Sequence, residues 1–287
     1  MFTKMLKVAI IGSGQIGIDL LYKISRLDFV KLVALVGRHI RSVPDGVFYS
    51  PDSINYFKTN KNCCDVVFDC TDAYSAIENE KVFRAQGITV IDMTPSKIGK
   101  LYVPYISSAL GTNFNMVTCG GQVSLPFINY INTKSKQNIE YVEVISQISS
   151  ESAGMATRIN IDKYIETTEG AIRELFSIEN CKVILTINPS EFTVMETTVY
   201  IKTPRCELND FNDFIKLVRT YIPNYEIKSV PSWIDETLLM VHIKILGSGD
   251  YISKYAGNLD VINCAAIQLL KTITNNTHNM YNTILDI

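Results

Sequence analysis

The first 119 residues alternate short apolar runs with stretches of helical spacing. The run Leu6–Ile11 is nearly continuous, as expected of a strand that is buried on both faces of a parallel sheet. A helical repeat of apolar residues follows it, and the stretch 76–85 is also compatible with a helix. Further strands are predicted at 32–36, 65–69, 89–92 and 115–118. This order of elements predicts an α/β fold with a Rossmann dinucleotide-binding domain over residues 1–119.

The pattern changes beyond residue 119. Strands are predicted at 139–148, 182–187, 197–201, 226–230 and 238–246, with amphipathic helices at 161–175 and 211–218. Strands that alternate with helices after a parallel unit predict a second, α+β domain, here over residues 120–253. The segment 258–274 is apolar on several sides, so residues 254–287 are predicted to form a helix that packs back on the first domain.

Composition and charge narrow the class of protein. The formal net charge is −2, the pI is about 6.0, and the basic residues are scattered, which argues against a nucleic-acid or anionic-membrane surface. No apolar run is long enough to cross a bilayer, and the first residues lack a signal-peptide pattern. The 7 cysteines have no C-x-x-C spacing, so neither a metal site nor a disulfide framework is predicted. We expect a cytoplasmic protein in a reducing compartment.

A glycine-rich turn directly follows the first strand and precedes the first helix. Its residues are Gly12, Ser13, Gly14, Gln15, Ile16 and Gly17, in the G-x-G-x-x-G pattern. The first glycine permits the tight turn, the second lets the backbone approach a pyrophosphate, and the third lets the helix pack on the strand. The context favours a dinucleotide site over a glycine-rich turn without a ligand.

The end of the second strand carries arginine where an NAD-binding unit often has an acid. Arg38 and Arg41 are available there, and no Asp or Glu occurs before Asp45. A guanidinium group suits a 2′-phosphate, so the chain is predicted to use NADP at least as well as NAD. A solvated basic loop is the alternative interpretation.

The stretch Met116–Gln122 carries the candidate nucleophile, Cys119. A thiol at a strand end that faces a helix N-terminus meets oriented N–H groups, which favour the thiolate. Gly120 and Gly121 would let backbone amides approach a developing oxyanion. The alternative is a buried cysteine in a glycine turn. Asp69, Thr71 and Asp92 also follow strands at this sheet edge, and strand-end capping is favoured for Asp92.

These motifs resemble acylating acetaldehyde dehydrogenase, the family that partners 4-hydroxy-2-oxovalerate aldolase in the catabolism of aromatic hydrocarbons. The segments Met116–Gln122 and Ala256–Asp260 are close to the family's sequence at these positions, and the matching stretches run from end to end of the chain. The resemblance implies a fold like that of glyceraldehyde-3-phosphate dehydrogenase, with an α+β dimerisation and catalytic domain. It also implies a homodimer, an aldolase partner, and coenzyme A as co-substrate with NAD or NADP.

The resemblance assigns roles to particular residues. Cys119 is implied to be the catalytic nucleophile, with Asn160 beside it, and Asn258 is implied to meet the nicotinamide. The segment implied to line the cofactor comprises Ser152, Ala153, Gly154, Met155, Ala156, Thr157, Arg158, Ile159 and Asn160.

Three departures from the family pattern stand out. The chain looks shorter than the usual length, and Arg38 and His39 replace the cofactor-discriminating acid. Thr197 stands where the family has an aspartate that is implicated in catalysis. Glu196 is one position away and is expected to face the opposite side of its strand. His242 is expected in the core and His278 in a polar tail, so the identity of any base stays open.

The predicted reaction interconverts a short aldehyde and coenzyme A with an acyl thioester, through a thiohemiacetal and a thioacyl enzyme on Cys119. The rivals are a phosphorylating semialdehyde dehydrogenase, an amino-acid or imine dehydrogenase, a biosynthetic reductase of acyl thioesters, and a weakened homologue that binds an aldolase. The acyl acceptor and the effect of replacing Cys119 discriminate among them.

Overall fold

The computed structural model describes residues 5–38, 43–154, 157–158, 161–190 and 193–285. The chain divides into two compact units, each treated separately below. Unit 1 comprises Met1–Met116 and Ala266–Ile287, and unit 2 comprises Val117–Ala265. The sequence analysis places the corresponding divisions at residues 119 and 253.

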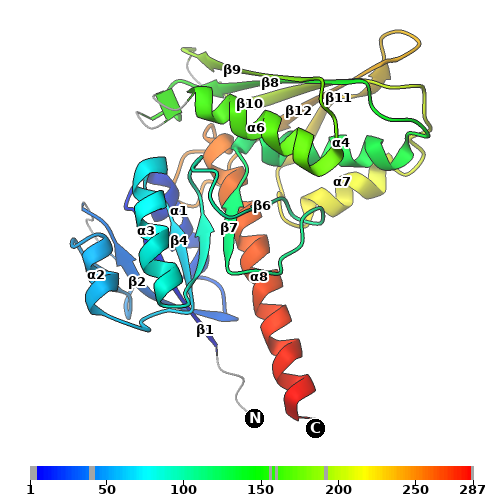
Figure 1. The fold of residues 1–287 in the computed structure, drawn as a ribbon. Helices are drawn as coiled ribbons and strands as arrows, with labels where there is room; N and C mark the ends of the chain where they lie inside the picture. The colour runs from blue at the N-terminus through cyan, green and yellow to red at the C-terminus, as the bar shows by residue number, and fades with distance from the viewer. Residues whose placement is uncertain (1–4, 39–42, 155–156, 159–160, 191–192, 286–287) are drawn as a thin grey trace. The chain divides into compact units, whose positions relative to one another are not determined.

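Unit 1 is built on a parallel sheet of 7 strands in the order β3-β2-β1-β4-β5-β7-β6. The strands are β1 (Leu6–Ile11), β2 (Val30–Val36), β3 (Phe48–Ser50), β4 (Val66–Asp69), β5 (Thr89–Asp92), β6 (Lys100–Tyr102) and β7 (Asn113–Met116). Its helices are α1 (Gln15–Ile24), α2 (Ile54–Thr59), α3 (Ala73–Ala85) and, from Ala266 onward, α8 (Gly257–Leu285). Figure 1 shows these elements. The parallel α/β fold predicted for this part is confirmed.

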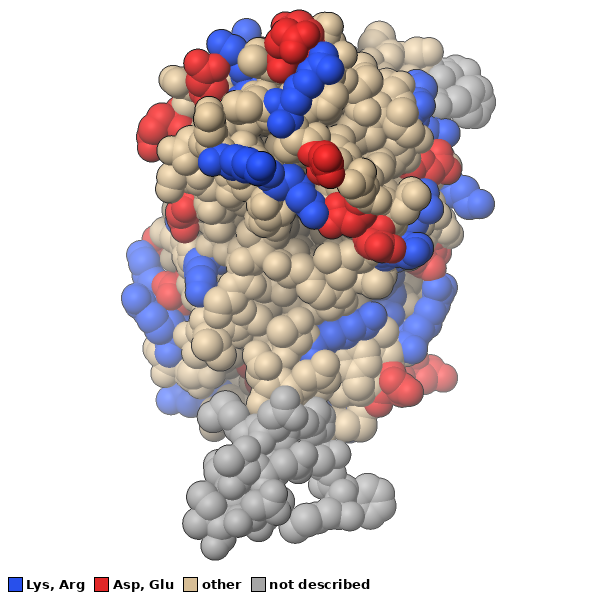
Figure 2. All heavy atoms as spheres, turned by 90° about the vertical axis from the view of Figure 1, so that its right-hand side faces the viewer, with Lys and Arg blue, Asp and Glu red and all other residues tan. Residues whose placement is uncertain are grey.

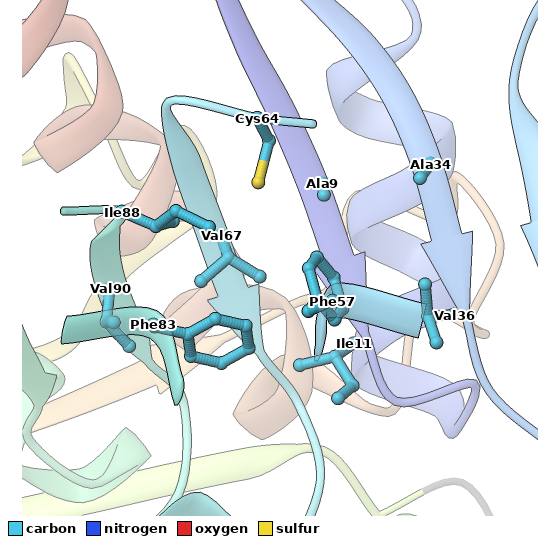
Figure 3. Packing of buried hydrophobic residues seen from close by; sticks show 10 residues of the cluster. All are labelled: Ala9, Ile11, Ala34, Val36, Phe57, Cys64, Val67, Phe83, Ile88 and Val90. Carbon is cyan, nitrogen blue, oxygen red and sulfur yellow. The ribbon is translucent and has the colours of Figure 1, made fainter. Parts of the chain in front are cut away.

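The core of unit 1 explains why the central strands are mostly apolar. Ala9, Ile11 and Val67 are fully buried, and they contact aromatic rings from the helices of the unit. Figure 3 shows Phe57 of α2 and Phe83 of α3 in this cluster, and their ring centroids lie 5.0 Å apart in an edge-on arrangement. The apolar runs therefore form a sheet with both faces covered, as a parallel sheet requires.

The strand order reverses at β1, which lies between β2 and β4. In such sheets ligands bind outside the carboxyl ends of the strands at the point of reversal. Gly12 follows β1 at this edge, and its N–H donates to the Val36 carbonyl at 2.7 Å. The glycine-rich turn thus occupies the ligand-binding edge of the unit.

Unit 2 contains a sheet of 5 strands in the order β11-β12-β10-β8-β9, in which only the pair β8–β9 is parallel. The strands are β8 (Tyr141–Ser149), β9 (Cys181–Asn188), β10 (Met195–Lys202), β11 (Tyr225–Trp233) and β12 (Leu238–Ile245). The helices α4 (Cys119–Lys134), α6 (Ile161–Phe176) and α7 (Phe211–Arg219) lie on one face of this sheet (Figure 1).

The alternation along β8, β10 and β12 fixes which side chains face these helices. In β10, Thr197, Val199 and Ile201 are buried, whereas the residues between them are partly exposed. The same period of two holds in β8 and β12. One face of the sheet therefore packs on the helices, and the other is a half-exposed surface.

Charged side chains of both signs are mixed on the face that Figure 2 shows. Figure 2 shows basic and acidic side chains interspersed on one face of the molecule, without a broad patch of one sign. Among the described residues, no helix combines the length and apolar character that crossing a membrane requires.

Candidate active site

Cys119 is the first residue of α4 in unit 2. Thr118 is the N-cap of this helix. Its Oγ1 accepts a hydrogen bond of 3.1 Å from the N–H of Gly121. The N–H of Gln122 donates to the Thr118 carbonyl at 2.8 Å. The N–H groups of Cys119 and Gly120 interact with the thiol itself. The helix N-terminus is thus directed at the sulfur, as its position in the sequence predicts.

Buried hydroxyl groups from three other elements surround this helix end. They belong to Tyr164 of α6, Ser146 of β8 and Thr197 of β10, and the Ser146 and Thr197 hydroxyl oxygens lie 3.0 Å apart. A Cβ atom at Gly120 would overlap the Tyr164 hydroxyl and lie 2.7 Å from Ser146 Oγ. Residue 120 must therefore be glycine for Tyr164 to approach the first turn of α4 this closely.

Two opposing effects set the pKa of Cys119. The residue is partly exposed, but the surrounding atoms desolvate its sulfur, and this burial raises the pKa of the thiol to about 11. The N–H groups at the helix end and the Tyr164 hydroxyl lower the pKa by a smaller amount. The expectation that the helix end favours the thiolate is confirmed in direction, but the net pKa of the thiol is raised. Desolvation, which depends on tertiary packing, outweighs the helix terminus.

This pKa predicts the pH dependence of alkylation at Cys119. The thiolate is the reactive form, so its fraction, and with it the rate of iodoacetamide modification, should rise about tenfold per pH unit between about pH 7 and 9.5. The rate is measured by mass spectrometry of the peptide that contains Cys119.

Cys63 serves as the reference within the same samples, because a hydrogen bond from Cys64 lowers the pKa of Cys63. Its modification rate should level off at a lower pH than that of Cys119. A Cys119 rate that reaches a plateau near neutral pH would contradict the assignment of a raised pKa.

The residues near the family's aspartate position do not supply a base. Thr197 is fully buried, and its hydroxyl lies against Ser146. Glu196 faces the other side of the sheet, where it contacts Lys228 Nζ at 2.6 Å and His242 Nε2 at 3.1 Å. The expected opposite orientation of Glu196 is confirmed. The expectation of a core His242 is wrong, because this side chain is partly exposed and paired with Glu196.

The glycine-rich turn of unit 1 has the spacing that a dinucleotide needs. Gly12 has a φ of +107°, and a Cβ atom there would overlap the Cys70 carbonyl. A Cβ atom at Gly17 would overlap the Gly12 carbonyl oxygen. At Gly14, by contrast, no heavy atom of the described chain lies within 4 Å of the Cβ position. Gly14 is also the N-cap of α1 without a side-chain cap, so the turn fits an anionic ligand.

The carboxylates at the same edge are engaged in local structure. Asp92 accepts hydrogen bonds from the Thr94 N–H at 2.8 Å, from Asn115 Nδ2 at 2.9 Å and from the Ser96 hydroxyl. Burial raises its pKa to about 7. Asp69 accepts bonds from Thr71, at 3.1 Å from its N–H. Both residues cap strand ends, as the sequence analysis favours for Asp92.

Arg38 is exposed at the end of β2. Burial alone would raise the pKa of Asp72, but hydrogen bonds from Ser75 and Tyr74 hold it below its ordinary value, and the Arg38 guanidinium charge adds the smallest contribution. The neighbouring His39 and Arg41 lie outside the described residues.

The segment after β8 forms a turn held by Arg158. Its Nε donates to the Ala153 carbonyl at 3.0 Å and its Nη2 to the Ser150 carbonyl at 3.1 Å. Ser152 Oγ donates to the Ser149 carbonyl at 2.9 Å. The Gly154 carbonyl accepts a hydrogen bond of 3.1 Å from the N–H of Arg158, and Thr157 is helical. Met155, Ala156, Ile159 and Asn160, which the sequence analysis also places in the site, lie outside the described residues.

Asn258 lies in the first turn of α8, on the part of that helix that belongs to unit 2. The residue is buried, and its Oδ1 has no hydrogen-bond partner among the described residues. A buried amide oxygen without a partner fits an acceptor for a ligand donor, such as a carboxamide N–H.

Sequence reasoning did not find Tyr164 and Ser146. Tyr164 lies in the predicted helix 161–175 and Ser146 in the predicted strand 139–148, and neither pattern reveals which hydroxyl meets the thiol. Only the crossing of α6 and β8 at the start of α4 brings them to Cys119.

Solved structures with a similar fold define the class of protein first. The chain resembles aspartate semialdehyde dehydrogenase II from Vibrio cholerae, with a TM-score of 0.68, 13% identity and coverage of 95% of this chain and 99% of that one. A probable aspartate-semialdehyde dehydrogenase from Pseudomonas aeruginosa gives a TM-score of 0.66 at 11% identity, with coverage of 94% and 98%. These likenesses establish the fold: a parallel α/β unit followed by an α+β unit.

Relatives with a similar sequence identify the family, which the solved structures do not. The chain is 42% identical to acetaldehyde dehydrogenase from Spirochaeta aurantia over 96% of its own length and 97% of that protein. It is 39% identical to the acetaldehyde dehydrogenase of Pectobacterium atrosepticum, over 94% of this chain and 96% of that one. Residues 119–253 match the family described as prokaryotic acetaldehyde dehydrogenase, dimerisation.

The chain therefore belongs to the acetaldehyde dehydrogenase family and is an oxidoreductase that acts on aldehydes. The resemblance stated from its motifs is confirmed. The alignments cover nearly the full length of both this chain and these relatives.

Proposed function

We propose that this chain oxidises a short aldehyde such as acetaldehyde to an acyl thioester of coenzyme A, reversibly, with Cys119 as the covalent nucleophile. The observation that supports this most is the partly exposed thiol at the first residue of α4, ringed by N–H and hydroxyl donors. Family membership supports the aldehyde as substrate. Coenzyme A as acyl acceptor follows from the acylating chemistry that the family resemblance implies.

Cys119 is the nucleophile in the first step and the leaving group in the last. Its sulfur, after losing its proton to solvent, attacks the aldehyde carbon, and the carbonyl electron pair moves onto oxygen. The N–H groups of Cys119 and Gly120 lie at the helix end to stabilise negative charge there, and Asn160 is a proposed further donor. A bound nicotinamide dinucleotide would accept the hydride. The coenzyme A thiolate then bonds to the acyl carbon, and the Cys119 sulfur departs as thiolate.

The dinucleotide is proposed to lie on the turn from Gly12 to Gly17. The open Cβ position of Gly14 and the uncapped start of α1 support this assignment. Residues 152–160 and Asn258 are proposed as further contacts, and the unpartnered Oδ1 of Asn258 supports the latter. NADP is proposed to bind at least as well as NAD because Arg38 is exposed where the ribose 2′-position is read.

Replacing Arg38 by alanine tests the cofactor proposal. We expect the KM for NADP to rise roughly tenfold or more while the KM for NAD changes little, because the guanidinium would contact only the 2′-phosphate. Arg84→Ala, an exposed arginine on α3 of the same unit, is the matched control. Equal kinetics with both cofactors, in the wild type and in Arg38→Ala, would remove the argument for NADP.

The acyl acceptor separates the proposed function from its nearest rival. With acetaldehyde and NAD or NADP, we expect reduced cofactor and acetyl-CoA to form when coenzyme A is present. Phosphate should not replace coenzyme A. A phosphate-dependent product would instead indicate a phosphorylating semialdehyde dehydrogenase. No hydride transfer with any acceptor would leave the aldolase-binding homologue as the better interpretation.

The proposed assembly is a homodimer formed through the half-exposed face of the sheet in unit 2. This face carries Ile145, Tyr200 and Met240, which are only partly buried within one chain. The matched family description, which names dimerisation for residues 119–253, supports this choice. An aldolase partner that supplies the aldehyde, and a cytoplasmic location that keeps Cys119 reduced, complete the proposal.

A further inference from the structure

The Cys119 thiolate needs a hydrogen-bond donor or a positive charge beside it to be stabilised. Among the described residues, no carboxylate, imidazole or ammonium group contributes to the pKa of this thiol. Glu196, the nearest acid in sequence to the family's aspartate position, is paired with Lys228 and His242 on the opposite face of the sheet. Any side-chain help for the thiolate must come from a neutral donor.

The Tyr164 hydroxyl is in position to be that donor. Its oxygen is fully buried, and it has no hydrogen-bond partner of standard geometry among the described residues. It lies against the first turn of α4, where a Cβ atom at Gly120 would overlap it, and it acts on the Cys119 thiol. A buried hydroxyl without a partner lowers stability, and a thiolate beside it would satisfy its proton.

The hydroxyl groups of Thr118 and Thr168 have their protons assigned. Thr168 Oγ1 donates to the Tyr164 carbonyl at 2.9 Å and lies 2.6 Å from Thr118 Oγ1. Since a hydroxyl has one proton, Thr118 must donate to Thr168, and it accepts from the N–H of Gly121. Thr118 therefore has no proton left for the sulfur, whereas the Tyr164 side chain contributes a hydrogen bond to this thiol.

The pair Ser146 and Thr197 can orient this donor. Both residues are fully buried, and their hydroxyl oxygens are 3.0 Å apart. Ser146 Oγ lies beside the Tyr164 hydroxyl at Gly120. With Thr197 donating to Ser146 and Ser146 donating to Tyr164, the Ser146 and Tyr164 hydroxyl groups each accept one proton and donate one. The Tyr164 proton then points to the sulfur of Cys119.

We propose that Tyr164 is a catalytic residue whose hydroxyl donates a hydrogen bond to the Cys119 thiolate, with Ser146 and Thr197 as positioning residues. The phenol keeps its proton, because burial and the charge of Cys119 raise the pKa of Tyr164 well above its ordinary value. It therefore acts as a donor and not as a base. The same bond stabilises the sulfur when it forms and when coenzyme A displaces it, so this role rests on the proposed function.

Tyr164→Phe tests the proposal, because it keeps the ring and removes only the hydroxyl. Loss of a hydrogen bond to a charged group should raise the pKa of Cys119 by about one to two units. A more basic thiolate is also more nucleophilic, so alkylation of the Cys119 peptide at fixed pH should fall by about 3- to 10-fold. The value of kcat should fall as well, with the Kd for the dinucleotide unchanged.

The matched control is Tyr225→Phe. Tyr225 is also fully buried in unit 2, and its hydroxyl donates to the Val123 carbonyl of α4 at 3.0 Å. This variant loses a buried hydroxyl against the same helix, so a merely structural effect would appear in both variants. We expect Cys119 alkylation in Tyr225→Phe to equal that of the wild type.

A second substitution at position 164 should change the rate of Cys119 alkylation in the opposite direction. Site-specific 3-fluorotyrosine at position 164 has a more acidic phenol and is a stronger donor, so alkylation of Cys119 at fixed pH should become faster. Alkylation unchanged in both Tyr164→Phe and the fluorinated protein would overturn the proposal.

The alkylation assay contains no aldehyde, dinucleotide or coenzyme A. If the wild type formed no acyl thioester while Tyr164→Phe still slowed alkylation, the proposed function would fail and the donor role of Tyr164 would stand. The converse pair of results would remove Tyr164 alone.

Discussion

Cys119→Ser should lower the rate of acyl-CoA formation by about a thousandfold or more while leaving the fold and the dinucleotide affinity intact. A serine hydroxyl stays protonated where a thiol can ionise, and it is a far weaker nucleophile in a site without a base. The turn that is proposed to hold the dinucleotide belongs to the other unit of the chain, so its affinity should not depend on this sulfur. Steady-state rates and calorimetric titration measure the two quantities.

Cys206→Ser is the matched control for this substitution. Cys206 is another partly exposed cysteine of unit 2, and it takes no part in the proposed chemistry. Its variant should retain wild-type turnover. Substantial turnover in Cys119→Ser would refute the nucleophile and return the amino-acid or imine dehydrogenase to consideration.

The second large effect is a difference between two substitutions in the glycine-rich turn, Gly17→Ala and Gly14→Ala. Gly17→Ala would force a methyl group into the Gly12 carbonyl oxygen, a backbone atom that cannot move without distorting the turn. We expect a loss of about 3 kcal/mol or more in the free energy of unfolding.

Gly14→Ala should leave that free energy within about 0.5 kcal/mol, because the Cβ position is open and a φ of −74° suits alanine. Its methyl group would occupy the space through which a pyrophosphate approaches the backbone, so the Kd for the dinucleotide should rise about 10- to 100-fold. Thermal unfolding and calorimetric titration read out the two effects. An unchanged Kd in Gly14→Ala would place the dinucleotide elsewhere.

Much of the fold could be predicted because the apolar pattern carries it. The strand 89–92 was predicted with the bounds found for β5, since a buried run between polar ends leaves little freedom. The elements β3, α2 and β6 were missed because segments of three to six residues are too short to show a period. The fold class, which depends on the order of the long elements, was therefore predicted correctly.

The site was only partly predictable. The position of Cys119 at a helix N-terminus follows from a local strand–glycine–helix pattern, which a sequence displays. Its raised pKa depends on how many atoms surround the sulfur, and that is decided by the packing of α6 and the sheet. The contact between the Tyr164 hydroxyl group and Cys119 could not be predicted for the same reason, because the pattern around Tyr164 predicts only a buried helix face.

The covalent bond to Cys119 is the central claim, and one measurement tests it directly. The protein is incubated with acetaldehyde and NAD in the absence of coenzyme A, and its peptides are analysed by mass spectrometry. The account predicts an acetyl group on the peptide that contains Cys119 and its disappearance as acetyl-CoA when coenzyme A is added. Formation of acetyl-CoA at the full rate by a protein whose Cys119 never carries the acetyl group would contradict it.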